Sequence, residues 1–183
     1  ELLYGLPFEV FATSSIDALV HAVESVLSPK ATPYTKLFGY KAIEMIISGY
    51  QTLVSEGRDK LKGLLEDFLI ASNYAGLAFG TAGCGAVHAM AYPLGGQYHV
   101  AHGESNYVIF TSVMKNYTAL RQDGEIGKLN SFLANLLGCE TADVYTEVEN
   151  LLNNVLPKKT LHEYGVKEEE LAEFSRSVIE NQQ

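Results

Sequence analysis

The sequence of 183 residues predicts an all-α helical bundle that forms one domain over residues 1–183. Through most of the chain, apolar residues recur at intervals of three and four, the period of a helix packed along one face. Few stretches alternate between apolar and polar residues as strands do. No internal repeat or Pro/Ser-rich linker divides the chain, and short turns separate the helical stretches, which favours a bundle with short loops.

The first expected helix carries a regular apolar stripe formed by Ile16, Leu19, Val20, Val23 and Leu27. Thr13 or Ser14 is expected to cap its N-terminus, and Ser28-Pro29 is expected to end it. A second side holds small residues, and the remaining side holds a polar row made of Asp17, His21, Glu24 and Ser28. With so little charge elsewhere, we expect this helix to be buried over much of its circumference.

The second and third helices are expected over about residues 32–57 and 59–79. Pro33 suits the first turn of the second helix, whose apolar face is expected to be Leu37, Ile43, Ile46, Ile47, Tyr50 and Val54. The apolar positions of the third are Leu61, Leu64, Leu65, Phe68 and Leu69. The glycine-rich stretch 80–85 is then expected to bend the chain.

A fourth helix is expected over about residues 85–94, ending at Gly95-Gly96. A loop carrying His99 and His102 follows, and a fifth helix is expected to begin near Gly103. Three more helices are expected over about residues 125–137, 143–154 and 168–180.

Composition excludes several classes of protein. The net charge of −9, without a basic cluster, argues against nucleic acid or an anionic membrane as the main partner. The longest apolar runs fall short of the ~18 residues that cross a bilayer, and no signal peptide opens the chain. Cys84 and Cys139 do not make a disulfide framework, which favours the cytoplasm. The chain begins at Glu1 and both ends resemble interior sequence, so we expect a fragment of a longer protein.

Asp17 and His21 are spaced one helical turn apart and therefore share a helix face. A buried carboxylate needs a cation or several hydrogen-bond donors, and this spacing lets a carboxylate and an imidazole hold one metal ion. The alternative is structural: Ser14 and Asp17 could form a variant capping box, with His21 an ordinary core histidine.

His88 and His102 form a second candidate pair. His88 lies on an apolar helix, and the Gly95-Gly96 turn is expected to return His102 toward it. With Asp17 and His21, they would give one carboxylate and three imidazoles, a set that suits a divalent transition metal. The alternative is two unrelated histidines, one in a core helix and one at a helix start.

Two stretches resemble the signatures of the iron-containing (group III) alcohol dehydrogenases. Residues 15–25, SIDALVHAVES, resemble the signature D-A-L-x-H-A-x-E. Residues 88–106 resemble the second signature, which joins H-A-x-A/S-x-x-L-G-G to a later H-G-x-x-N. The resemblance covers essentially the whole chain, down to residues 157–166. Within the family, residues 13–17 and 27–34 are most similar to the 4-hydroxybutyrate dehydrogenases of fermentative bacteria.

The resemblance implies the all-helical, dehydroquinate-synthase-like C-terminal domain of that family. We expect the family's N-terminal dinucleotide-binding domain to be absent from residues 1–183, because they hold no strand, glycine-rich turn and helix in succession. The last C-terminal helices of the family are also expected to be missing after Gln183. The metal ligands implied by the resemblance are Asp17, His21, His88 and His102. They would hold Fe²⁺ or Zn²⁺, and the intact enzyme would use NAD(P).

The resemblance also gives roles to two aromatic residues. Phe79 matches a position that lines the cleft between substrate and nicotinamide. Tyr92 takes a position that is often a second histidine, with a catalytic role in proton transfer or cofactor contact, so a histidine relay there is in doubt. Ala101 stands where the family often has proline, which is expected to loosen the loop that holds His102.

Five other features have weaker expectations. His99 is expected to lie behind the ligands or on the surface, and Cys84 to fill a small core space rather than face the site. Glu24 is expected to make helix-to-helix hydrogen bonds rather than act in catalysis. His162 is expected to be solvated, and Glu168–Glu170 to form the acidic first turn of a helix.

The resemblance thus implies the metal-binding domain of an NAD(P)-dependent alcohol dehydrogenase that interconverts a primary alcohol and its aldehyde. The favoured pair is 4-hydroxybutyrate and succinate semialdehyde. A metal-dependent hydrolase using the same four ligands, and a helical metal-binding fragment without activity, are the alternatives. The expected partner is a small-molecule alcohol or aldehyde. The sequence leaves the oligomeric state open, a homo-oligomer included.

Overall fold

A computed structural model describes residues 3–181, and within them the chain forms eight α-helices, two short 3-10 helices and no strand. The α-helices are α1 (Phe8–Leu27), α2 (Pro33–Glu56), α3 (Leu61–Ala82), α4 (Ala86–Tyr98), α5 (His102–Leu120), α6 (Gly124–Leu137), α7 (Val144–Val155) and α8 (Glu168–Asn181). The 3-10 helices are η1 (Arg58–Lys60) and η2 (Leu161–Tyr164). The predicted all-α bundle is confirmed.

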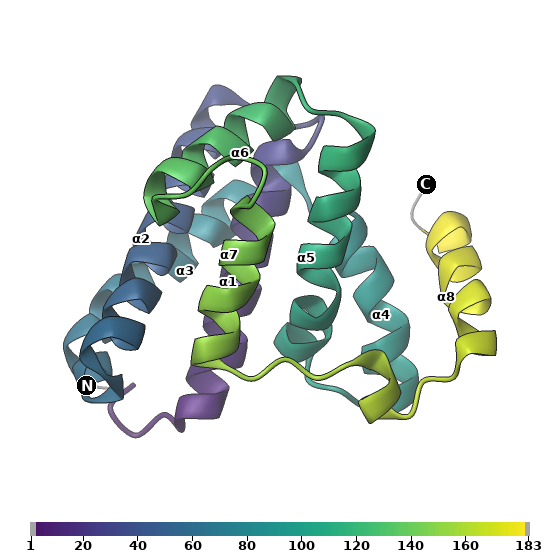
Figure 1. Cartoon of the computed structure of the whole chain (residues 1–183), viewed down its shortest axis with the longest axis horizontal. Helices are drawn as coiled ribbons and strands as arrows, with labels where there is room; N and C mark the ends of the chain where they lie inside the picture. Colours follow the sequence, from purple (N-terminus) through teal and green to yellow (C-terminus); the bar gives the residue numbers. More distant parts are fainter. Residues whose placement is uncertain (1–2, 182–183) are drawn as a thin grey trace.

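Helix α1 is the central element of the bundle. It packs against α2, α3, α5 and α6 (Figure 1) and supplies much of one continuous hydrophobic core. The apolar runs of the sequence predict no membrane-spanning segment. By length and hydropathy, α1 is nevertheless long and apolar enough to cross a membrane, and it is the one such helix among the described residues. However, 67% of its apolar window is buried inside the bundle, which is the behaviour of a core helix.

The start of α1 differs from the prediction. The helix begins at Phe8, five residues before Thr13, because Phe11 extends its buried face into the core at 3% exposure. Thr13 is therefore no cap, and its hydroxyl donates to the Glu9 carbonyl within the helix (3.0 Å). Asp17 lies in the third turn, so the alternative in which Ser14 and Asp17 form a capping box is wrong.

Helix α2 follows its prediction at both ends, with Thr32 as the N-cap and Gly57 as the C-cap. On its predicted apolar face, Ile43, Ile46, Ile47 and Tyr50 are fully buried. Three predicted apolar positions on α2 and α3 are wrong, since Leu37, Val54 and Leu69 are 67%, 43% and 57% exposed. They lie outside the stripe that neighbouring helices cover, because helix packing buries a narrower strip than the apolar pattern marks.

The connection between α4 and α5 is also corrected. Helix α4 continues through Gly95 and Gly96 to Tyr98, and the chain reverses at His99, which adopts the left-handed conformation (φ 54°). A Cβ on Gly95 would lie 3.6 Å from the Val100 carbonyl oxygen. That distance is an ordinary van der Waals contact, so the returning chain packs on Gly95 without requiring a glycine there. His102 is the first residue of α5 instead of a loop residue.

The C-terminal helices α6, α7 and α8 begin and end within two residues of their predicted limits. Helix α8 lies at the edge of the bundle, where it packs on α4 (Figure 1). Its first turn holds Glu168–Glu170, as predicted. This edge stands apart from the junction of α1, α4 and α5, where the candidate site lies.

Candidate metal centre

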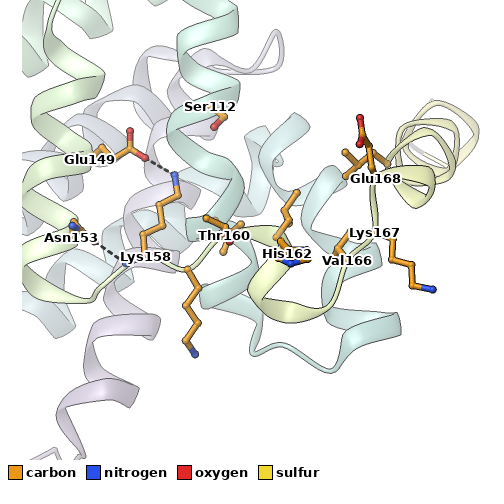
Figure 2. A pocket seen from close by; sticks show the side chains of 13 residues that line it. Ser112, Glu149, Asn153, Lys158, Thr160, His162, Val166, Lys167 and Glu168 are labelled. Carbon is orange, nitrogen blue, oxygen red and sulfur yellow. Dashed lines mark hydrogen bonds and ion pairs between the residues drawn. The ribbon is translucent and has the colours of Figure 1, made fainter.

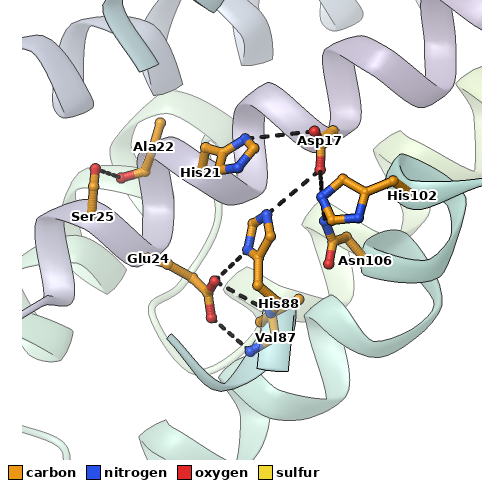
Figure 3. A network of polar contacts seen from close by, with 9 residues as sticks. All are labelled: Asp17, His21, Ala22, Glu24, Ser25, Val87, His88, His102 and Asn106. Carbon is orange, nitrogen blue, oxygen red and sulfur yellow. Dashed lines mark hydrogen bonds and ion pairs between the residues drawn. The ribbon is translucent and has the colours of Figure 1, made fainter. Parts of the chain in front are cut away.

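Four side chains from three helices meet beside α1 (Figure 3). Asp17 and His21 project from α1, His88 from α4, and His102 from the first position of α5. Each offers one ligand atom, and these atoms all lie within 4.8 Å of one another. Their predicted convergence is confirmed, while the ligand role itself stays a prediction.

The spacing of the donor atoms suits a shared ion better than a hydrogen-bonded cluster. The Asp17 carboxylate oxygens lie 3.6 Å from His21 Nδ1, 3.7 Å from His88 Nε2 and 3.6 Å from His102 Nε2. These separations exceed hydrogen-bond lengths, whereas ligands about 2.1 Å from a tetrahedral ion lie about 3.4 Å apart. His88 Nε2 is also buried without a hydrogen-bond partner. The donor set therefore fits a divalent metal.

Gly103 explains how His102 reaches the centre. A Cβ at this position would overlap the Thr13 carbonyl and crowd Cβ of Asp17. Only glycine lets the start of α5 approach α1 this closely, which places His102 opposite Asp17.

Asn106 is a member of the site that the sequence analysis missed. Its side-chain amide donates to Asp17 Oδ1 (2.6 Å) and lies 3.3 Å from His102 Nε2. Asn106 is fully buried on α5, one turn after His102. That i, i+4 spacing was the available signal, and the amide fixes the carboxylate from the side away from α1.

Burial and neighbouring groups shift the pKa values of Asp17, His21 and His88 in different directions. Burial alone would raise the pKa of Asp17, but the neighbouring imidazoles, His88 first, and the Asn106 amide hold it below its usual value. Burial lowers the pKa of His21, which favours the neutral ring that ligates metals. Burial would also lower the pKa of His88, yet the neighbouring Asp17 carboxylate, Cys84 sulfur and Glu24 carboxylate raise it to about 11. An ion binding there would have to displace a proton.

Phe79 lies against the site, as the prediction for a cleft residue requires. Its ring stacks on His21 with centroids 4.1 Å apart and an angle of 18° between the planes. A hollow of about 1030 Å³ lies beside the site. Helix α1 lines it with Asp17 and His21, and helix α3 lines it with Phe79 and its neighbours. The hollow gives a small molecule access to the donor atoms, while contact with a nicotinamide stays a prediction.

Tyr92 lies beside the centre without belonging to the four donors. Its ring is 6.4 Å from that of His102, the two planes meet at 20°, and the residue is 54% exposed. The predicted catalytic role is untested by this placement. Ala101 caps α5 with φ −55°, a value that proline also adopts, and the expected loosening of the segment before His102 stays a prediction.

The remaining candidates separate clearly. His99 and His162 are exposed, as predicted. Cys84 is exposed as well, so its expected role as a core filler is wrong, and its sulfur lies close to Glu24 and His88. Glu24 makes the expected helix-to-helix hydrogen bonds, to Val87 and His88 of α4.

A second hollow, of about 750 Å³, lies beside α7 and the segment before α8 (Figure 2). Several cationic residues line it, including Lys158, Lys159 and Lys167. In Figure 2, Lys158 points inward to pair with Glu149, whereas Lys167 points away. This hollow shares no residue with the four-donor centre and offers no comparable set of free donors.

Comparison with known proteins gives a consistent result. The family model described as Fe-containing alcohol dehydrogenase family, C-terminal, matches residues 11–183. The chain is 50% identical to the 4-hydroxybutyrate dehydrogenase of Clostridium kluyveri, over 100% of this chain and 49% of that protein. It is 36% identical to long-chain-alcohol dehydrogenase 1 of Geobacillus thermodenitrificans, over 98% of this chain and 46% of that protein.

Among solved structures, 1,3-propanediol oxidoreductase superimposes with a TM-score of 0.78 at 29% identity, over 97% of this chain and 47% of that one. The chain thus spans about half the length of the curated relatives it matches.

Proposed function

The chain belongs to the Fe-containing alcohol dehydrogenase family, and from that membership we propose that it is the metal-binding half of an NAD(P)-dependent alcohol dehydrogenase. The observation that carries the proposal is the meeting of Asp17, His21, His88 and His102 at one point. Family membership also argues against the metal-dependent hydrolase.

Asp17, His21, His88 and His102 would hold Fe²⁺, or Zn²⁺ in its place. When bound, the ion supplies a Lewis acid that polarises an alcohol or aldehyde oxygen, and NAD(P) carries the hydride. The chain's own part is positioning. Asn106 fixes the Asp17 carboxylate, and Phe79 stacks on His21 to hold its ring. The ring of Tyr92 lies 6.4 Å from that of His102, and in this proposal its hydroxyl would pass a proton.

The proposed substrate pair is 4-hydroxybutyrate and succinate semialdehyde, supported by 50% identity to the Clostridium enzyme over the whole chain. A carboxylate substrate needs a cationic or hydrogen-bonding anchor. Among the described residues, the lining of the hollow beside Asp17 contains no Lys or Arg, but it includes Ser72 and Asn73. We therefore place the cationic anchor in the part of the enzyme that this chain does not include.

A chimera tests the proposal. The chain replaces the matching half of the Clostridium enzyme, and oxidation of 4-hydroxybutyrate is followed by NADH formation in the presence of Fe²⁺ or Zn²⁺. We expect the chimera to be active and its His88→Ala variant to be inactive. The 183-residue chain alone should show negligible turnover, because it lacks the nucleotide-binding half.

A folded chimera that binds metal but oxidises neither 4-hydroxybutyrate nor a plain primary alcohol would contradict the proposed function. Activity with plain alcohols alone would keep the dehydrogenase and remove the proposed substrate. Turnover by the isolated chain would contradict the need for the second half.

We further propose a cytoplasmic location. Cys84 is an exposed free thiol and Cys139 is also free, which suits a reducing compartment. Fractionation of source cells, with a cytoplasmic marker followed alongside, checks the location.

A further inference from the structure

Glu24 is a buried carboxylate outside the four-donor set. It follows Asp17 by two turns on α1, and only 1% of its side chain is exposed. A carboxylate this deep must be fully hydrogen-bonded or paired. Its partners are all on α4, at the residues that lead into the metal centre (Figure 3).

The carboxylate caps α4 from a neighbouring helix. The N-cap residue of α4 is Gly85, which has no side chain that could accept a hydrogen bond from the first turn. Instead, the Val87 N–H donates to Glu24 Oε1 (2.6 Å), and the His88 N–H approaches Oε2 (3.4 Å). A Cβ on Gly85 would lie 2.9 Å from Oε1, so the glycine makes room for the carboxylate.

The same carboxylate also holds the His88 ring. Oε2 of Glu24 lies 2.6 Å from Nδ1 of His88, on the edge of the ring opposite to Nε2. Nε2 in turn faces Asp17 at 3.7 Å and has no hydrogen-bond partner. One ring nitrogen is therefore occupied by Glu24, and the other is turned toward the centre.

We propose that Glu24 is a positioning residue of the metal centre, which keeps a proton on His88 Nδ1 and thereby presents Nε2 to the ion. The inference rests on the proposed metal site. A carboxylate that accepts the second N–H of a ligating histidine fixes both the tautomer and the ring orientation and raises the basicity of the ligand. Because Glu24 also caps α4, the position of the His88 backbone and the direction of its ring depend on one side chain.

The first test locates the proton in the unaltered chain. The ¹⁵N-labelled chain is loaded with Zn²⁺, and long-range ¹H–¹⁵N spectra assign the two nitrogens of His88. We expect the proton on Nδ1, with a hydrogen-bonded chemical shift, and Nε2 as the metal-bound nitrogen. Coordination through Nδ1, or a His88 that stays unbound, would overturn the inference without any variant.

The second test measures metal affinity in Glu24→Gln. Glutamine has the same size but a single carbonyl oxygen, so it cannot accept from both Val87 and His88 Nδ1. We expect binding of Co²⁺, followed by its visible absorption, to weaken about 10- to 100-fold, the range for outer partners of metal-bound histidines. The absorption spectrum should also shift, because His88 would be free to turn.

Ser28→Ala is the matched control. Ser28 lies one turn beyond Glu24 and also ties α1 to a neighbouring helix, through a hydrogen bond to the Ala82 carbonyl (2.6 Å), but it touches no ligand. We expect it to lower thermal stability and leave Co²⁺ affinity unchanged. Equal losses of affinity in both variants would reduce Glu24 to a structural role and overturn the inference.

The outcomes separate the two proposals. If the unaltered chain binds neither Co²⁺ nor Zn²⁺ at the four donors, the metal site itself fails. If it binds them and folded Glu24→Gln keeps the same affinity and spectrum, only the positioning role of Glu24 fails.

Discussion

Two polar clusters in this bundle differ in whether their polar atoms have partners within the cluster. In the lysine cluster beside α7, formed by Lys115, Glu149, Lys158 and Thr111, each charge has a partner. Glu149 accepts from Lys158 (2.7 Å) and Lys115 (2.8 Å), and Lys158 also donates to the Thr111 hydroxyl (3.0 Å). This cluster is complete in itself.

The metal centre, in contrast, leaves polar atoms without partners. Its carboxylate lies 3.6–3.7 Å from three imidazole nitrogens, and Nε2 of His88 has no partner at all. A structural cluster closes its contacts internally, whereas a binding cluster leaves donor atoms aimed at a common point. Hollows occur beside both clusters, so the unpaired donors distinguish a binding site better than the empty volume does.

The sharpest test of this contrast is Asp17→Asn. The substitution keeps the size of the side chain but removes the one negative charge among the four donors. We expect Co²⁺ affinity to fall by more than about 100-fold, beyond the usual effect of an outer partner. Titration of the folded variant, with folding checked by circular dichroism, measures the loss. Unchanged affinity would show that the four donors do not share the ion.

Gly103→Ala tests the close approach of α5 to α1 that forms the same centre. The added methyl group would overlap the Thr13 carbonyl, so α5 must move away from α1. We expect a loss of about 2 kcal/mol in the free energy of unfolding, from overpacking, together with weaker metal binding.

Gly96→Ala is the matched control for Gly103→Ala. It adds the same methyl group within α4, where nothing lies within 4 Å. Alanine there should be neutral or stabilising. Denaturant unfolding compares the two variants, and equal stabilities would contradict the close approach of α5 to α1.

The sequence predicted what is local and repetitive. The ends of α2 follow from Thr32, Pro33 and Gly57, because caps and breakers act within one turn. The ligand set could be named because two signatures resemble a family, and Asp17 and His21 share a face at i, i+4.

The sequence could not supply what depends on neighbours in space. Gly95-Gly96 fits the pattern of a helix end, yet α4 continues to Tyr98 and the chain reverses at His99. Leu37 and Leu69 fit apolar stripes but are mostly exposed. The amide of Asn106 gains its role only because Gly103 brings α5 against α1, a contact between residues far apart in the chain.

A smaller effect is expected from Lys158→Met in the lysine cluster. Methionine keeps most of the aliphatic length but leaves Glu149 with Lys115 alone. We expect a loss of about 1 kcal/mol in the free energy of unfolding, since the pair is only partly buried, and no change in Co²⁺ affinity. Chemical denaturation and metal titration of the same sample check both. Weakened metal binding would show that the two clusters are coupled.

The smallest effect is the pH dependence that Glu149 contributes. Burial would raise the pKa of this carboxyl, but the ammonium groups of Lys115 and Lys158 outweigh it and lower the pKa to about 2. The unfolded chain therefore takes up a proton at higher pH than the folded chain, so stability falls as the pH drops. The contribution is complete above about pH 4.5 and is lost progressively toward pH 2.

Glu149→Gln isolates this contribution, because glutamine does not titrate. The variant should be less stable than the unaltered chain at pH 7, and the gap should close as the pH falls from about 4.5 toward 2. Unfolding by urea at a series of pH values measures the gap. A gap that stays constant across this range would mean that Glu149 contributes through packing rather than through its charge. In that case the lysine cluster would no longer serve as the charge-paired counterpart of the metal centre.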